Sequence, residues 1–144
     1  MSKIEWPDYS VAVWNGCHKV SSGCKYCYAE AMAKRLKNAQ WGANTPRPQT
    51  KHWRKKIAAF AAKAGRGGVR YKVFINPTSD TFEDHPALTE VRNDLLCMFI
   101  AYPELDFLLL TKRPENVCGM IPEAWRLEGA PDNVWLGFSA ENQH

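Results

Sequence analysis

The chain has 144 residues, of which 45% are hydrophobic and 12% aromatic, so we expect one globular domain with a substantial core rather than a disordered chain. No apolar run is long enough to cross a bilayer, and the first residues lack the apolar segment of a secretory signal. Five cysteines, three of them clustered, do not form the even, spread-out pattern of a secreted disulfide scaffold. We therefore expect a soluble, cytoplasmic protein.

The net charge of +4 hides an uneven distribution along the chain. Residues 1–30 hold three basic and three acidic side chains, residues 31–79 hold twelve basic and no acidic ones, and residues 80–144 hold four basic and twelve acidic ones. The basic stretch 34–72 predicts a polyanionic partner, either nucleic acid or a phosphorylated substrate. The alternative is a solvated helical face.

The first third of the chain predicts a strand, a cysteine loop and two helices. Residues 4–15 contain the apolar run 11–14 and predict a strand that leads into the loop 16–28. Strong helix formers over 28–39 predict a helix. A breaker-rich loop over 41–48 separates it from a second helix over 52–64.

The remaining sequence continues the alternation. Strands are predicted over 71–76, 105–111 and 133–138, with a helix over 87–102 and a short helical region over 120–127. The third strand is apolar at consecutive positions, so we expect it to be buried on both faces. Each strand is followed by a cluster of polar residues.

Repetition of strand, polar loop and helix indicates parallel strands joined by right-handed crossovers. The predicted fold is α/β, either a partial (βα) barrel or an open, mostly parallel sheet of about four strands with flanking helices. Ligand sites of such folds gather at the C-terminal ends of the strands. The cysteine loop follows the first strand and belongs to that edge.

The cysteine loop has the spacing Cys17-x6-Cys24-x2-Cys27. Zinc would take these three thiolates with a histidine as fourth ligand, and the candidates are His18, His52, His85 and His144. A zinc site of this type usually has a second ligand pair at similar spacing, and none is present. A 4Fe-4S cluster held by three thiolates leaves one iron for an external ligand and is favoured over zinc. Three unligated thiols are the structural alternative.

Ordered motifs over nearly the whole chain carry a resemblance to a known family. They are Ile4-Glu5-Trp6, Trp14-Asn15, Gly16-Cys17, Val20-Ser21, Gly23-Cys24-Lys25, Cys27-Tyr28-Ala29-Glu30, Val73-Phe74-Ile75-Asn76, Ser79-Asp80, Leu110-Thr111-Lys112-Arg113-Pro114, Val134-Trp135-Leu136-Gly137, Ser139 and Glu141-Asn142. Together they look like a phage-borne family of unknown function, which is similar to the radical S-adenosylmethionine (SAM) enzymes.

The resemblance implies that Cys17, Cys24 and Cys27 ligate a 4Fe-4S cluster whose open iron chelates the amino and carboxylate groups of SAM. Electron transfer would cleave the sulfonium and give a 5′-deoxyadenosyl radical that abstracts hydrogen from a substrate. The cofactor-binding residues implied are Tyr26 beside cluster and adenine, Ser79 and Asp80 for the methionine amino group, and Ser139 and Glu141 for the ribose. The alternative for the last four is helix capping or turn formation.

The expected function is a radical-SAM-like enzyme acting on a nucleic-acid-related substrate, in the host cytoplasm if the protein is phage-encoded. Lys112 and Arg113 would meet a phosphate or carboxylate of the substrate, or else form a solvated turn. Residues 1–144 form one domain with fewer strand–helix units than such a barrel needs, so we expect that the chain is an N-terminal fragment, that a partner chain completes the sheet, or that the activity is lost. The open apolar edge of the fourth strand would favour self-association. The alternative function is a zinc-stabilised or metal-free nucleic-acid-binding protein without catalysis.

Overall fold

A computed structural model describes residues 4–140 and contains one sheet of four parallel strands. The strands are β1 (Tyr9–Val11), β2 (Tyr71–Ile75), β3 (Leu105–Thr111) and β4 (Val134–Phe138), and they lie side by side in chain order. Every neighbouring pair is parallel, with Val73 paired to Phe107 and Phe107 to Val134. The predicted α/β fold is confirmed, and its sheet is open.

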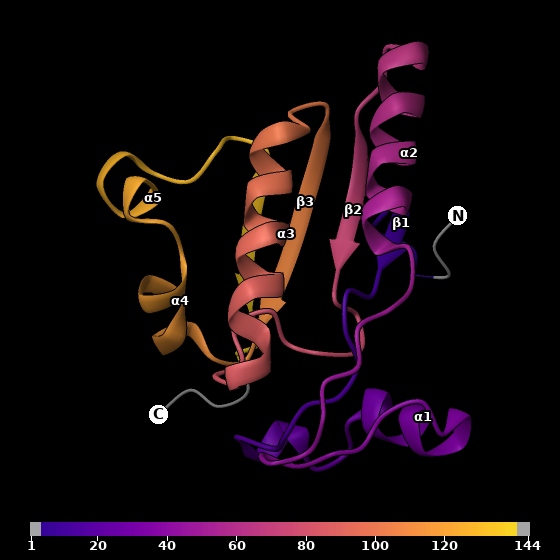
Figure 1. Ribbon diagram of the computed structural model, residues 1–144, viewed down its shortest axis with the longest axis vertical. Coiled ribbons are helices and arrows are strands. Elements are labelled where there is room, and N and C mark those ends of the chain that lie inside the picture. Colours follow the sequence, from indigo (N-terminus) through magenta and orange to yellow (C-terminus); the bar gives the residue numbers. More distant parts are fainter. Residues whose placement is uncertain (1–3, 141–144) are drawn as a thin grey trace.

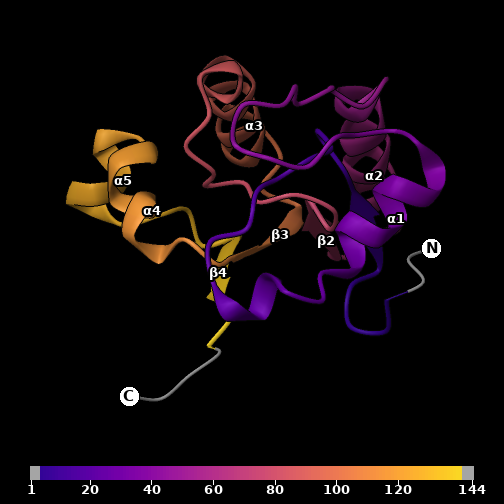
Figure 2. The same cartoon turned by 90° about the horizontal axis from the view of Figure 1, so that it is seen from below.

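Helices join the strands and cover one face of the sheet. The chain forms α1 (Tyr28–Leu36), α2 (Trp53–Gly67), α3 (Thr89–Ala101), α4 (Pro114–Met120) and α5 (Glu123–Glu128), with 3₁₀ turns η1 (Ser22–Cys24) and η2 (Pro86–Leu88). The long helices α2 and α3 lie on the same face of the sheet, with α4 and α5 beyond α3 on the β4 side (Figure 2). The short α1 lies away from the sheet, beyond the C-terminal ends of the strands (Figure 1).

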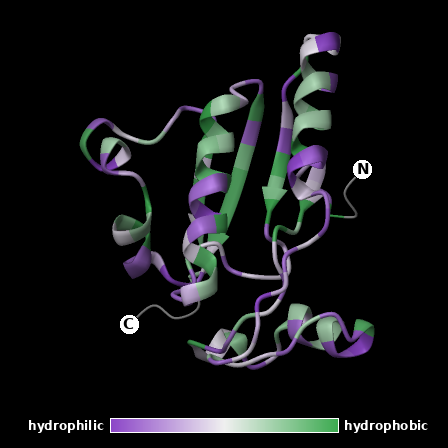
Figure 3. Ribbon diagram, in the orientation of Figure 1, coloured by the Kyte–Doolittle hydropathy of each residue, from purple (hydrophilic) through white to green (hydrophobic). Residues whose placement is uncertain are grey.

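The hydrophobic core lies between the covered face of the sheet and the helices. Trp53, Ile57, Ala61 and Ala64 are spaced by three or four residues, so they share one side of α2, and all four are buried. On β3, alternate residues face the helices, and Phe107 stacks on Phe99 of α3 with ring centroids 4.3 Å apart. Figure 3 shows largely hydrophobic strands beside helices that carry both hydrophobic and hydrophilic residues.

The prediction that the third strand is buried on both faces is wrong. Leu105, Phe107 and Leu109 are buried, but Leu108 is half-buried and Leu110 is 43% exposed. The reason is that α2 and α3 cover only one face, so a run of apolar residues places every second side chain on the open face. On that open face Phe74 is covered by Trp6, with ring centroids 4.7 Å apart.

β4 forms one edge of the sheet and keeps large apolar side chains in solvent. Trp135 is 60% exposed and Phe138 is 65% exposed. The predicted helical region 120–127 corresponds to α5, while α4 ends at Met120 and was not predicted; Pro122 lies between the two helices at the N-cap position of α5. Among the described residues, none of the helices combines the length and apolar character needed to span a membrane.

Candidate functional site

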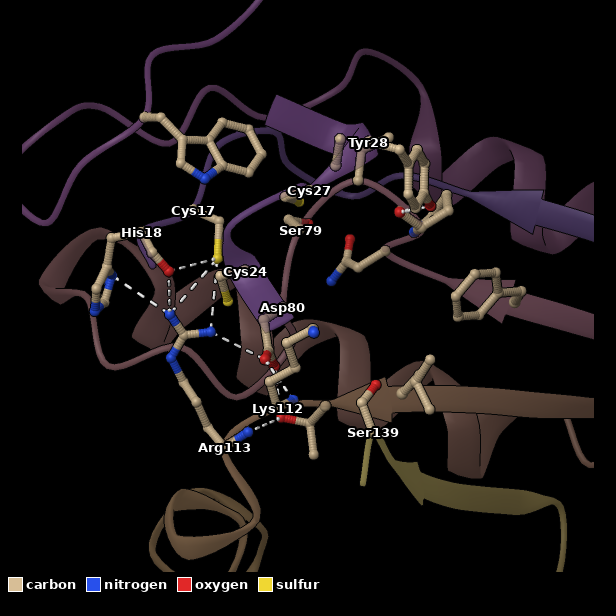
Figure 4. Close-up of a pocket in the computed structure, with 18 residues that line it drawn as sticks. Cys17, His18, Cys24, Cys27, Tyr28, Ser79, Asp80, Lys112, Arg113 and Ser139 are labelled. Atoms are coloured by element: carbon tan, nitrogen blue, oxygen red, sulfur yellow. Dashed lines mark hydrogen bonds and ion pairs between the residues drawn. The ribbon is translucent and has the colours of Figure 1, made fainter. Parts of the chain in front are cut away.

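A cavity of about 140 Å³ opens at the C-terminal ends of the strands, where the cysteine loop meets the loops after β2, β3 and β4 (Figure 4). The segments that build it are far apart in the sequence and meet because all four strands point to this edge. The residues that line it are Cys17, His18, Cys24, Cys27, Tyr28, Ala29, Trp41, Phe74, Asn76, Pro77, Thr78, Ser79, Asp80, Leu110, Thr111, Lys112, Arg113 and Ser139.

The cysteine loop is fixed by a glycine at its start and a helix at its end. Gly16 has φ +97°, and a Cβ there would lie 3.1 Å from the Gln40 carbonyl oxygen and 3.3 Å from Arg47 Cδ. Glycine is therefore required both by the backbone conformation and by the space. The turn η1 ends at Cys24, and Cys27 is the N-cap of α1. Cys17, Cys24 and Cys27 all line the cavity.

The structure does not bring Tyr26 to the cavity. Its ring is 87% exposed and lies near the Lys25 ammonium group, 5.4 Å from the ring centroid. Because Cys24 and Cys27 both face inward, the two residues between them lie on the outside of the turn. Tyr28 lines the cavity instead, and its hydroxyl donates a hydrogen bond to the Pro77 carbonyl.

Side chains after β2 bind the backbone that leads from β1 into the cysteine loop. Asn76, at φ 55°, accepts a hydrogen bond from the Val13 N–H at 2.8 Å through Oδ1 and donates to Thr81 Oγ1 at 3.0 Å. Ser79 Oγ donates to the Trp14 carbonyl at 3.0 Å. Ser79 thus lines the cavity while it holds the neighbouring loop in place.

Asp80 joins the loop after β2 to the end of β3. Its Oδ1 accepts from Thr111 Oγ1 at 2.7 Å and from the Phe82 N–H at 3.0 Å. Its Oδ2 accepts from the Lys112 N–H and from Arg113 Nη1, both at 3.0 Å. The bond to the N–H two residues ahead is the turn-forming role considered as an alternative for Asp80. The dashed lines in Figure 4 show its carboxylate directed at Arg113.

Arg113 is buried, with 3% exposure, and its guanidinium points at the first cysteine. Nη1 and Nη2 each lie 3.6 Å from Cys17 Sγ, and Nη2 also donates to the His18 carbonyl at 2.9 Å. The group predicted to meet a substrate phosphate or carboxylate is therefore bonded to the protein. Lys112 and Ser139 do line the cavity, and Glu141 lies outside the described residues.

A second buried ion pair, Glu83 with Arg47, contacts the cysteine loop through His18. Glu83 has no exposed side-chain surface and accepts from Arg47 Nε at 2.9 Å and from His18 Nδ1 at 2.9 Å. Arg47 also donates to the Gly42 carbonyl at 2.9 Å. Burial alone would raise the pKa of Glu83, but the hydrogen bonds from Arg47 and His18 and the positive charges nearby hold that pKa below its usual value.

The sequence did not identify this pair, since nothing local to Arg47 or Glu83 predicts a partner 36 positions away. The one available signal was the opposite charge of residues 31–79 and 80–144. The structure pairs these two segments directly, through Arg47–Glu83, Arg54–Asp94 and Arg70–Asp106. Part of the predicted polyanion-binding charge is therefore neutralised within the chain.

The environments of two of the cavity thiols differ. Burial raises the pKa of Cys17, while the Arg113 charge and its N–H groups act in the opposite direction. Burial also disfavours the Cys24 thiolate, but hydrogen bonds from the backbone at Val20 and Ser21 outweigh it and lower the pKa of Cys24. A metal bound at Cys17 would displace its proton, because thiolates are the ligating form.

The histidines predicted as fourth zinc ligands have other roles in the described part of the chain. His18 lines the cavity, but its Nδ1 is bonded to Glu83. His85 uses both ring nitrogens, one with the Thr45 carbonyl and one with the Ala87 N–H. His52 is exposed at the start of α2, and His144 lies outside the described residues.

The donor set fits an iron–sulfur cluster held by three thiolates. Cys17, Cys24 and Cys27 are free thiols on one cavity, whereas Cys97 and Cys118 are exposed on α3 and α4. Within residues 4–140, no three His, Cys, Asp or Glu side chains already converge as a metal site, so ligation requires the three thiols to draw together. Metal binding is coupled to folding, so the free energy of ligation can drive such a local rearrangement.

Fold and cavity together define a parallel α/β protein with a cysteine-lined pocket at the C-terminal edge of its sheet. The chain belongs to a family described as protein of unknown function (DUF5131), whose model matches residues 1–144. Searches of curated proteins and of solved structures gave no match.

Proposed function

We propose that this protein is a radical-SAM-like iron–sulfur enzyme that binds a 4Fe-4S cluster through Cys17, Cys24 and Cys27. The observation that carries the proposal is the separation of the five cysteines into two groups. Three free thiols from one loop line a single cavity at the ligand-binding edge of a parallel sheet, and the other two are exposed on helices. Three thiolates leave one iron open for SAM.

The rest of the cavity supports a nucleoside ligand beside the cluster. Phe74 and Leu110 provide apolar surface for a planar base, and Ser139 lines the cavity directly after the end of β4. When bound, such a cluster supplies one electron, obtained from a low-potential reductant, that cleaves a carbon–sulfur bond of SAM into methionine and a carbon radical. The protein's part is to orient the ligand and keep water from the reacting centre.

Cysteine variants test this proposal. Wild-type protein, reconstituted with iron and sulfide without oxygen, should show the visible charge-transfer absorbance of an iron–sulfur cluster and a change in its electron paramagnetic resonance (EPR) signal when SAM is added. Cys17→Ala, Cys24→Ala and Cys27→Ala should each lose most of the bound iron. Cys97→Ala and Cys118→Ala are the matched controls and should keep it.

Two results would contradict the proposal. If pocket and control variants bind the same amount of iron, the three clustered thiols are not the ligands. If the oxygen-free protein binds stoichiometric zinc and no iron, the site is a zinc site and the nucleic-acid-binding alternative without catalysis takes its place.

The first turn of α2 supports a polyanionic substrate for the same pocket. Lys51 lies just before the helix and Lys55 and Lys56 lie in its first turn, and all three are exposed, whereas Arg54 is paired with Asp94. Basic residues are unfavourable for the helix here, because its N-terminus already carries partial positive charge. α2 begins at the edge of the sheet that carries the cysteine loop (Figure 1). These residues would attract nucleic acid or a phosphorylated substrate toward the cavity.

Salt dependence tests that assignment. Binding of a fluorescent single-stranded oligonucleotide should weaken steeply as salt concentration rises, and the triple variant Lys51→Gln, Lys55→Gln, Lys56→Gln should reduce both affinity and salt slope. A flat salt response, or unchanged binding by the triple variant, would remove the polyanion from the proposal. The iron content of this variant should equal that of the wild type, because its residues lie outside the cavity lining.

The exposed edge strand supports association with a further strand, from a second copy or from a partner chain. Trp135, Leu136 and Phe138 present apolar surface on β4, at an edge where backbone groups are available for pairing. Sedimentation of the purified protein should show concentration-dependent association that Phe138→Lys weakens. A monomer at all concentrations would leave only a partner chain for this edge.

A further inference from the structure

Arg113 is the one arginine whose guanidinium lines the cysteine cavity, among the described residues, and it is held in a single orientation. It lies two residues after Thr111, the last residue of β3, and precedes Pro114, the first residue of α4, so its backbone is held between two elements. Its N–H donates to Thr111 Oγ1 at 2.9 Å. The side chain is bonded to Asp80 Oδ2 at 3.0 Å and to the His18 carbonyl at 2.9 Å.

Further N–H contacts of the guanidinium lead to Cys17, and Nη2 also lies 3.5 Å from His18 Nδ1. Nη1 and Nη2 both lie 3.6 Å from Sγ, within hydrogen-bond distance for sulfur. Asp80 cannot turn away from Arg113 without losing other bonds, because its oxygens also bind Thr111 Oγ1 and the backbone N–H groups of Phe82 and Lys112. The cavity therefore contains a fixed cation with two N–H groups directed at one of the three thiols.

We infer that Arg113 is a positioning residue that orients Cys17 Sγ for cluster ligation and raises the reduction potential of the bound cluster. The inference rests on the proposed function, since it requires a cluster at Cys17. One-electron reduction, with dithionite as the reductant, adds one negative charge to the cluster and its thiolates. N–H donors and a positive charge at a ligating sulfur stabilise that added charge, so they favour the reduced form.

A redox titration of the reconstituted protein, followed by EPR, tests this role. Arg113→Met removes the charge and the N–H groups that contact Cys17, so the reduction potential should become more negative. The expected shift is about 59 mV or more, which corresponds to a tenfold change in the equilibrium constant of one-electron reduction. Arg113→Lys keeps the charge but loses the fork, so its potential should fall between those of Arg113→Met and the wild type. Arg126→Gln, which removes an exposed arginine of α5 that does not line the cavity, is the matched control and should leave the potential unchanged.

Arg113→Met leaves the buried Asp80 carboxylate without its partner and could fail to fold. In that case the double variant Arg113→Met, Asp80→Asn removes both charges and should still show the more negative potential, since the N–H···S bonds are lost. A wild-type potential in the Lys and Met variants, at normal iron content, would overturn the inference and leave the cluster proposal standing. Absence of a cluster from the wild type would overturn both.

Discussion

The core beneath α2 and α3 and the pocket edge of the sheet are held together by different interactions. The core consists of apolar side chains such as Phe99 and Phe107, whose removal from water stabilises the fold. The pocket edge contains two buried ion pairs, Glu83–Arg47 and Asp80–Arg113. Buried ion pairs add little net stability compared with apolar side chains of the same size.

What these pairs do provide is fixed geometry. Glu83 and Arg47 connect the loop after β2 to the loop before α2, and His18 joins the same cluster. Asp80 and Arg113 connect the loop after β2 to the end of β3 and to Cys17. The comparison indicates that the fold depends on the core, while the position of the cysteines depends on charged side chains.

The largest expected loss of stability is in the core. Phe107→Ala should lower the free energy of unfolding by about 4 kcal/mol, because it leaves a cavity against Phe99. Leu110→Ala, on the open face of the same strand, should cost only about 1 kcal/mol because that side chain is already partly in water. Urea denaturation measures both. Equal losses would mean that the open face is covered in solution.

Breaking one buried ion pair should lower the free energy of unfolding somewhat less than Phe107→Ala does. Glu83→Gln leaves the Arg47 guanidinium buried without its counter-charge and should lower the free energy of unfolding by about 3 kcal/mol. Glu30→Gln is the control, since Glu30 pairs with the exposed Lys19 and Lys34, and such pairs contribute less than about 1 kcal/mol. A Glu83→Gln protein as stable as the control variant would show that the pair does not hold the edge.

The Glu83–Arg47 pair also predicts that the free energy of unfolding depends on pH. The pKa of Glu83 is lower in the folded protein than in the unfolded chain, so its contribution is complete above its usual pKa and is lost as the pH falls through the lowered value. Unfolding free energies measured between about pH 3 and pH 7 should therefore fall at the acid end. Glu83→Gln should show a smaller fall, and an identical slope in both proteins would contradict the assignment.

A smaller loss of stability than that of Glu83→Gln is expected from a substitution at the start of the cysteine loop. Gly16→Ala places a Cβ at a positive φ, 3.1 Å from the Gln40 carbonyl oxygen, and should cost about 1–2 kcal/mol. Gly65→Ala is the control, because a Cβ there meets nothing within 4 Å and α2 favours alanine. Thermal unfolding compares the two, and a Gly16→Ala protein no less stable than the control would mean that the loop start is not constrained.

The sequence predicted most of the fold because strands and helices are marked by local patterns. The apolar run Leu105–Thr111 predicted β3 with its observed bounds, and the helical pattern over 52–64 predicted most of α2. Local patterns do not show what covers each face, so the burial of β3 on both faces was predicted wrongly.

The site was harder to predict for the same reason. Ser79, Lys112 and Ser139 were predicted as site residues because they follow strands, and they do line the cavity together with the three cysteines. Side-chain direction within a loop depends on contacts between distant segments, and so Tyr26 lies outside while Arg113 points to Cys17. The ion pair between Arg47 and Glu83 has no local signal at all, since neither residue lies in a pattern that specifies the other.

The central claim is that the three cavity thiols hold an iron–sulfur cluster, and metal analysis of protein purified without oxygen tests it most directly. We expect iron and acid-labile sulfide in near-equal amounts, lost together from Cys24→Ala and retained by Cys97→Ala. Protein that contains neither iron nor sulfide after anaerobic reconstitution, or that contains zinc alone, would contradict the account.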